Sequence, residues 1–217
     1  RYGNPARFSR AVPRVEIDME KVMELAVREL RANGHKRLAL AMPYPFRTMD
    51  VRRLAFCSLM EEVYGNRIKD YYIGIHREEL PEDPRILAFQ EDEDRESGMY
   101  LPEEDFFGKG ELAAQLFAER KIDATAVAFN DEFALGMCKR FHALGIQVPR
   151  DISLIGIDGS SARKYRDPCL TSVGLFPEKQ GARCVDTLLD MLEGKKVKYV
   201  SGSPIKLIKG DSVRKLE

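Results

Sequence analysis

The 217-residue sequence has no tryptophan, only three histidines and only four cysteines. The histidines lie far apart without metal-ligand spacing, and the cysteines form no C-x-x-C pair. Scattered cysteines are typical of reduced thiols in a cytoplasmic protein. No apolar run approaches the roughly 18 residues that a membrane-spanning helix needs. We therefore predict a cytoplasmic protein with no membrane span, no metal and no cofactor.

The chain also lacks net charge, because 35 Lys and Arg residues balance 35 Asp and Glu residues. This balance gives no indication that the segment binds nucleic acid or an anionic membrane by itself. The opening "RYGNPARFSR" is no signal peptide and reads like the interior of a protein, so it predicts nothing about targeting. The chain has neither a G-x-S-x-G elbow nor a paired Ser/His/Asp arrangement, so we do not expect an enzyme.

What the sequence does contain is an alternation of strand-like and helical patterns. Short runs that are apolar throughout predict strands buried on both faces, at 37–42, 71–75, 125–129, 152–157 and 171–175. Amphipathic stretches predict helices from Met19 to Gly34 and at 50–64, 110–121, 131–144 and 177–192. This alternation predicts an α/β protein with a mainly parallel sheet. In such sheets ligands bind where the carboxyl ends of strands lead into helices.

Residues 79–105 interrupt the pattern with three prolines and a run of acids, and we predict a long surface excursion there. The following "GKGELA" (108–113) matches a dinucleotide-binding fingerprint, but no strand precedes it. The acids from Asp92 match some positions of a calcium-binding loop, but Ser97 stands where that loop needs glycine. We expect neither a dinucleotide nor a calcium site.

Polar groups follow three of the predicted strands. Arg53 lies in the first turn of the helix after strand 37–42, Asn130 and Asp131 follow strand 125–129, and Asp158 follows strand 152–157. A guanidinium, an amide and a carboxylate can together bind the vicinal hydroxyls of a sugar, since they both donate and accept hydrogen bonds. Phe46, Phe106 and Phe107 border the same edge and could pack against the apolar face of a sugar ring.

Each of these residues also has a structural explanation. Asp131 is a good helix N-cap, and capping is its predicted main role. A cap needs only one residue of the Asn130–Asp131 pair, so a ligand contact and a structural role stay equally open for Asn130. Turn formation with Gly159 competes with ligand binding for Asp158. Arg53 could be a solvated helix arginine.

Residues 125–173 resemble one known family. Strand, Asn-Asp, Ala-Leu-Gly, "VPRDIS", Gly-x-Asp and "DPCLTSV" occur in the order and spacing of the effector-binding domain of the lactose/galactose repressor family of bacterial transcription regulators. Upstream, "VEIDMEKVMELAVRELRANGHKRLALAM" is similar to the segment where the second lobe of that domain begins. Downstream, "FPEKQGARCVDTLLDMLEGK" and "IKLIKGDSV" match its end. The resemblance therefore covers nearly the whole chain.

The resemblance implies a periplasmic-binding-protein-like fold of type I, in which two α/β lobes hold an effector between them. The family's sugar-contacting arginine, amide and carboxylate fall on Arg53, Asn130 and Asp158, and its aromatic platform falls near Phe106. Leu175 replaces a glutamine that the family often has, so some hydroxyl contacts are not expected here.

The same resemblance implies a division of the chain. Residues 1–15 correspond to the end of the first lobe and 16–172 to a three-layer second lobe. Residues 173–196 correspond to a strand and helix that return to the first lobe, and 197–217 to an extended segment that returns to the second. The DNA-binding module and most of the first lobe have no counterpart, so we expect a fragment that lacks its N-terminal part.

The expected function is thus the ligand-sensing domain of a cytoplasmic regulator that binds a sugar-like effector and controls operator binding. The expected partners are that effector, operator DNA through a helix-turn-helix absent from this chain, and a second copy in a homodimer. The alternative is a periplasmic sugar-binding protein of a transport system, which shares the fold. A doubly wound enzyme would need a catalytic constellation that the sequence does not contain.

Overall fold

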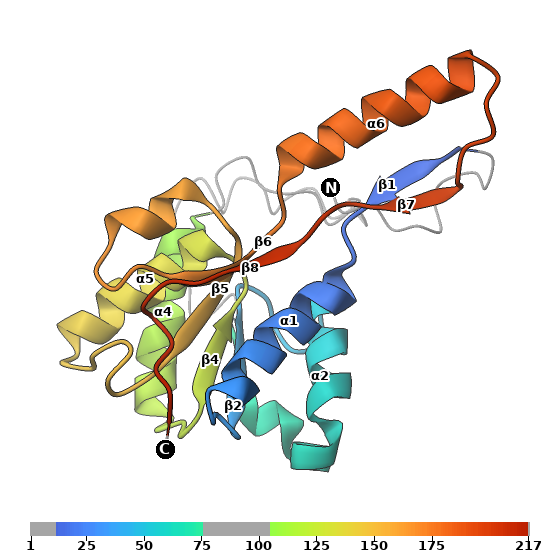
Figure 1. Ribbon diagram of the computed structural model, residues 1–217. Helices are drawn as coiled ribbons and strands as arrows, with labels where there is room; N and C mark the ends of the chain where they lie inside the picture. Colours follow the sequence, from blue (N-terminus) through green and yellow to red (C-terminus); the bar gives the residue numbers. More distant parts are fainter. Residues whose placement is uncertain (1–11, 76–104, 217) are drawn as a thin grey trace, which may run out of the picture.

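The computed structural model describes residues 12–75 and 105–216, and Figure 1 shows their arrangement. A six-stranded sheet forms the centre, in the order β3-β2-β4-β5-β6-β8. The first five strands in this order pair in parallel, and β8 runs antiparallel to β6. Their bounds are Tyr72–Gly74 (β3), Leu38–Met42 (β2), Thr125–Ala128 (β4), Leu154–Asp158 (β5), Thr171–Gly174 (β6) and Lys206–Ile208 (β8). The predicted α/β class and mainly parallel sheet are confirmed.

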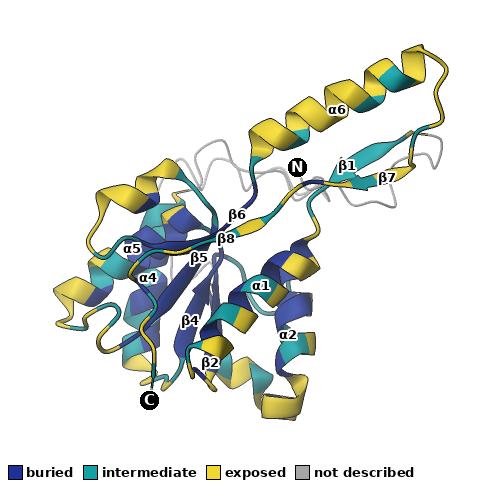
Figure 2. Ribbon diagram, viewed as in Figure 1, coloured by how far each residue is buried: buried dark blue, intermediate teal, exposed yellow. Residues whose placement is uncertain are grey.

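Helices cover both faces of this sheet. α1 (Met19–Ala32) and α2 (Val51–Tyr64) pack on one face, while α4 (Phe106–Glu119) and α5 (Asp131–Ala143) pack on the other (Figure 1). Every residue of β2 and β4 is buried, as expected for strands that lie between two helical layers (Figure 2). Two short 3₁₀ helices complete the layers, η2 (Gly65–Tyr71) and η4 (Ser161–Tyr165).

A second, smaller group of elements projects away from the six-stranded sheet. β1 (Arg14–Glu16) pairs in parallel with β7 (Val200–Gly202), and α6 (Pro177–Leu192) lies beside them (Figure 1). No residue of α6 is buried, and its exposed apolar side chains are Val185, Leu188, Leu189, Met191 and Leu192 (Figure 2). β6 pairs with β5 as far as Gly174, so the main sheet extends two residues beyond the predicted boundary at 172.

The remaining differences from the sequence prediction concern one helix and the excursion. α4 begins at Phe106, four residues before the predicted start, because Asp105 caps it by accepting a hydrogen bond from the Gly108 amide. Its two early glycines conceal this start, since glycine is a poor helix former. Most of the predicted excursion lies outside the described residues. Within 12–75 and 105–216, no helix is long and apolar enough to cross a membrane.

All four cysteines are free thiols, as expected. Three of them, Cys57, Cys138 and Cys169, are half-buried, whereas Cys184 on α6 is exposed. Burial raises the pKa of the Cys138 thiol to about 12, so this side chain stays protonated and packs as a small apolar group.

Two glycines allow α4 and α5 to cross in close contact. A Cβ added at Gly110 would overlap the carbonyl oxygen of Phe133, and one added at Gly136 would overlap the carbonyl oxygen of Phe107. The second glycine of "GKGELA", Gly110, and the glycine of "ALG", Gly136, are therefore packing residues at a helix crossing.

We expect Gly136→Ala to lower the free energy of unfolding by about 1–3 kcal/mol, because the added methyl group forces the two helices apart. Gly181→Ala is the matched control, since nothing lies within 4 Å of a Cβ at that helical position. The control should raise the free energy of unfolding by about 0.5–1 kcal/mol. Urea denaturation of both variants tests this, and equal stabilities would contradict the close crossing.

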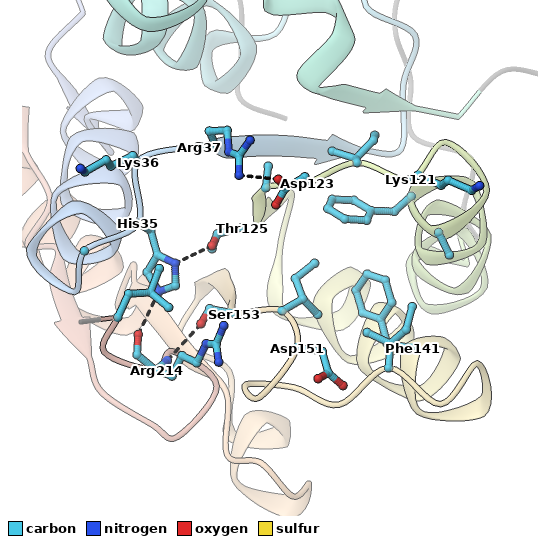
Figure 3. A pocket seen from close by; sticks show the side chains of 18 residues that line it. His35, Lys36, Arg37, Lys121, Asp123, Thr125, Phe141, Asp151, Ser153 and Arg214 are labelled. Atoms are coloured by element: carbon cyan, nitrogen blue, oxygen red, sulfur yellow. Dashed lines mark hydrogen bonds and ion pairs between the residues drawn. The ribbon is translucent and has the colours of Figure 1, made fainter.

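A depression of about 690 Å³ lies at the amino-terminal edge of the sheet, and Figure 3 shows its lining. The buried His35 connects the α1–β2 loop to β4 and to the C-terminal segment there. One ring nitrogen, Nε2, lies 2.9 Å from the carbonyl oxygen of Arg214, and Nδ1 lies 2.7 Å from the Thr125 hydroxyl. Because a carbonyl only accepts, Nε2 carries the proton and Nδ1 accepts from Thr125. Burial lowers the pKa of His35.

A lowered histidine pKa has a defined effect on stability. As the pH falls below 6.5, the ordinary pKa of histidine, the unfolded chain takes up the proton before the folded chain does. The contribution of His35 to stability is therefore complete above pH 6.5 and declines below it. We expect the wild type to lose stability relative to His35→Gln between pH 7 and 5, by at most about 1.4 kcal/mol per pH unit. Equal changes in the free energy of unfolding with pH for the wild type and His35→Gln would contradict this. The control is His142→Gln, which replaces an exposed histidine.

Candidate functional site

Polar residues gather at the carboxyl edge of the sheet, opposite the depression. β2, β4 and β5 are neighbouring parallel strands, so the residues that follow them reach one edge. Asp158 is the last residue of β5, and Asn130 lies two residues after β4. Arg52 and Arg53 occupy the first turn of α2, which begins nine residues after β2. The structure therefore brings these polar groups to the same side of the molecule, as the sequence predicts.

Asp158 has two unusual properties. Its backbone has a φ of 113°, a conformation that residues other than glycine rarely adopt and that costs on the order of 1–3 kcal/mol. Burial and the neighbouring charge of Asp131 raise the pKa of the Asp158 carboxyl to about 7, although Arg52 acts in the opposite direction. No hydrogen bond reaches the Asp158 side chain from any residue that the structure describes. Strain and a displaced pKa at a strand end are typical of a functional site.

Asn130 is the N-cap of α5, which corrects the prediction that Asp131 caps this helix. The Asn130 side-chain oxygen accepts a hydrogen bond of 2.8 Å from the Phe133 amide. Its backbone is extended, as an N-cap requires, whereas Asp131 is already the first helical residue. The Asn130 amide nitrogen has no partner within the described part of the chain. Asn130 can therefore cap the helix through its oxygen and donate to a ligand through its nitrogen.

Asp131 is fully buried and bonds to neighbouring segments of the sheet edge. Its Oδ1 accepts from the Ser172 hydroxyl at 2.6 Å, and its Oδ2 accepts from the Ser160 amide at 2.6 Å. Burial raises the pKa of Asp131, while these hydrogen bonds and the charge of Arg163 oppose that rise. Both carboxylate oxygens of Asp131 thus accept hydrogen bonds from within the protein, whereas the Asp158 side chain accepts none from the described residues.

The two arginines of α2 point to different neighbours. The Arg53 Nε donates to the Thr48 carbonyl at 2.9 Å, and its guanidinium lies 5.0 Å from the centre of the Phe46 ring. The Arg52 guanidinium lies 4.0 Å from the centre of the Phe129 ring and lowers the pKa of Asp158. Arg52, which sequence reasoning assigned no ligand contact, is therefore the arginine whose charge acts on Asp158. Helical periodicity alone does not distinguish two adjacent arginines.

A cluster of aromatic rings lies beside Arg52 at this edge. Phe106 lies 5.3 Å from Phe129 between ring centres, and Tyr44 meets Phe129 edge-on at 5.6 Å. Phe106 is thus part of the cluster at this edge, and its role as an aromatic platform stays a prediction. The other two predicted phenylalanines are not part of this cluster: Phe46 lies beside Arg53 and packs edge-on against Tyr72, and the Phe107 ring lies near the Lys139 ammonium. Phe129 is the aromatic residue that the sequence reading missed, because it looked like part of a buried strand.

The edge therefore combines a carboxyl group, an amide donor, a guanidinium and an aromatic surface. This set can bind a small molecule with several hydroxyl groups and an apolar face. Among residues 12–75 and 105–216, no group of three or more His, Cys, Asp or Glu side chains is placed to hold a metal ion.

The raised pKa of Asp158 predicts that its ionised carboxylate lowers the stability of the folded protein at high pH. Because this pKa is raised from 3.8 to about 7, the folded state favours the protonated carboxyl, and that advantage is lost as the pH rises through 7. We expect Asp158→Asn to match the wild type near pH 4 and to be more stable by roughly 1–3 kcal/mol at pH 8. Thermal unfolding across this pH range tests it, with the exposed Asp186→Asn as control. A variant less stable than the wild type at pH 8 would contradict the assignment.

Comparisons with known proteins agree with this geometry. Residues 27–213 match the periplasmic binding protein-like domain. The HTH-type transcriptional regulator MalR of Streptomyces coelicolor is 30% identical over 84% of this chain and 46% of its own length. The repressor PurR of Vibrio vulnificus is 34% identical over 48% of this chain and 32% of its own length. The chain thus spans less than half the length of these curated relatives, both of which are named as HTH-type transcriptional regulators or repressors.

Solved structures share the fold. A ribose-bound LacI family regulator from Enterococcus faecium superposes with a TM-score of 0.68 at 20% identity, over 94% of this chain and 67% of that one. The lac repressor dimer bound to operator gives 0.68 at 21% identity, over 95% and 63%. The chain therefore belongs to the family of periplasmic binding protein-like domains.

Proposed function

We propose that this chain senses a small polyhydroxylated effector, a sugar or a similar molecule, within a cytoplasmic bacterial transcription regulator. The effector binds at the carboxyl edge of the sheet, between this lobe and a second one, and controls operator binding by the complete regulator. The observation that carries the proposal is the convergence of Arg52, Asn130 and Asp158 beside the Phe106–Phe129 rings. The regulator names of the relatives favour this function over that of a transport protein or an enzyme.

The chemistry of each residue supports a hydroxylated ligand. The Asp158 carboxyl accepts hydrogen bonds when ionised and also donates when protonated, and with a pKa of about 7 it does both near neutral pH. The Asn130 amide nitrogen supplies a donor, and the Arg52 guanidinium, which also donates to Asp50 at 3.1 Å, adds positive charge beside Asp158. Arg53 remains the residue that matches the family arginine, and it lies next to Arg52 in the first turn of α2.

The projecting elements support an arrangement of two lobes. We assign α6, β1 and β7 to the first lobe, so that the apolar side chains exposed on α6 pack inside that lobe. The described part of the chain then crosses between the lobes three times: between β1 and α1, between β6 and α6, and between β7 and β8. An effector held between the lobes shifts the balance between open and closed arrangements in proportion to its preference for one of them. A two-fold dimer of the regulator would present paired DNA-binding modules to an operator.

A binding experiment on the regulator that contains this chain tests the proposal. D-Ribose is the first probe, because it is bound in the similar regulator from Enterococcus faecium, and a panel of pentoses and hexoses follows. We expect one member to raise the melting temperature and to bind in calorimetry. Asp158→Asn and Asn130→Ser should each weaken that binding by about tenfold or more, as one lost hydrogen bond to a charged or buried group predicts. Serine retains the helix cap but does not extend as far as asparagine.

The matched control is Glu62→Ala, which removes an exposed carboxylate near the C-terminal end of α2, away from this edge. This variant should bind the sugar within about twofold of the wild type. A panel without any binding sugar would contradict the proposed effector class. Equal affinity of all variants would contradict the proposed position of the site.

A further inference from the structure

We propose that Asp131 is a positioning residue of this site: its buried carboxylate holds the turn after β5 in the conformation that presents Asp158. The role of Asp131 in effector binding rests on the proposed function, whereas its hydrogen bonds to the turn do not depend on it. Asp131 does not compete with Asp158 for the effector, because both of its oxygens are already occupied within the protein.

Three hydrogen bonds form a clamp on the two residues that follow Asp158. The Ser160 amide donates to Asp131 Oδ2 at 2.6 Å. The Gly159 amide donates to the Ser172 hydroxyl at 3.0 Å, and that hydroxyl donates to Asp131 Oδ1 at 2.6 Å. A single carboxylate, directly and through one serine, therefore fixes two successive backbone amides. The clamp consists of Asp131, Ser172 and these two amides.

A carboxylate is the group that this clamp requires. Both of its partners donate, and both of its oxygens can accept, whereas an amide side chain offers only one acceptor. The neighbouring strand also makes room for it, since a Cβ at Gly156 would overlap Asp131 Oδ1. Ser172 lies on β6, so the clamp joins the start of α5 to β6 and to the turn after β5.

The conformation that the clamp holds is a strained one. Asp158 has a φ of 113°, and its own carbonyl accepts from the Leu175 amide at 3.1 Å. An aspartate without such restraints returns to a negative φ, which would move its carboxyl away from the position seen here. The backbone is therefore held on both sides of the strained residue, by Leu175 at Asp158 itself and by Asp131 just after it.

The clamp also acts on the charge of the site. Asp158 is influenced by Asp131, Arg52 and Glu132, and Asp131 in turn by Arg163. The two carboxylates repel each other, so the ionised clamp favours a proton on Asp158. Removal of Asp131 should then lower the pKa of Asp158, and so should removal of Glu132. Charge alone does not distinguish these two residues, but the geometry of the turn does.

Nuclear magnetic resonance on the complete chain tests the clamp without any ligand. In Asp131→Ala we expect hydrogen exchange of the Ser160 and Gly159 amides to accelerate by about tenfold or more, while the amides of β4 change little. The three-bond coupling between the amide and α protons of Asp158 should rise from the small value expected at a φ of 113° toward the large value of an extended strand. A residue that only supports the fold would not change this coupling.

Asp131→Ala leaves two buried donors without an acceptor and could prevent folding, so Ser172→Ala is the second variant. It removes the bridging hydroxyl alone, and we expect faster exchange at Gly159 and a partial rise in the Asp158 coupling. Glu132→Ala is the matched control, because it removes a nearby charge without touching the clamp. It should leave exchange and coupling as in the wild type and lower only the pKa of Asp158, followed through its carboxyl carbon.

Unchanged exchange and coupling in Asp131→Ala, or in Ser172→Ala if the first variant does not fold, would overturn the proposal. An equal acceleration throughout α5 and β5 would also overturn it, because that pattern belongs to general destabilisation. If the sugar panel fails while the turn loosens as expected, the clamp stands and the proposed effector is wrong. The reverse outcome removes the positioning role and leaves effector binding intact.

Discussion

Parallel pairing of β2, β4 and β5 is the constraint on which the rest of the site depends. It brings the ends of three strands to one edge, and each strand is followed there by residues with polar side chains. The strands are buried on both faces by two helical layers, so the edge is held rigidly. A rigid edge can carry a strained aspartate and a partly desolvated carboxyl, which a mobile loop would relax or hydrate.

Much of this architecture is predictable from the sequence. Continuous apolar runs identify β2 and β4, and the caps and glycines bound α1, α2 and α6 well. Asn130 and Asp158 are predictable as members of one cluster because strand ends in a parallel sheet share an edge. The start of α4 is not, because two glycines obscure a helix that tertiary packing stabilises. One of them, Gly110, is needed for the close crossing with α5.

The roles of adjacent residues are harder to predict. Asn130 and Asp131 both cap helices well in general, and only the fold shows that Asn130 makes the bond while Asp131 reaches Ser160 and Ser172. Those partners lie 29 and 41 residues away, so no local pattern reveals them. Similarly, whether Arg52 or Arg53 faces Asp158 depends on the rotation of α2 about its axis. The local sequence thus shows which polar groups are present at this edge, and long-range packing decides which of them makes each contact.

A structure of the regulator crystallised with its effector tests the account most directly. The account predicts ligand density at the carboxyl edge of the sheet, with hydroxyl groups within hydrogen-bond distance of the Asp158 carboxyl and the Asn130 amide nitrogen. An arginine of α2 and the Phe106–Phe129 rings should border the same molecule. Density at the opposite edge, in the depression beside His35, with the carboxyl edge occupied by water alone, would contradict it.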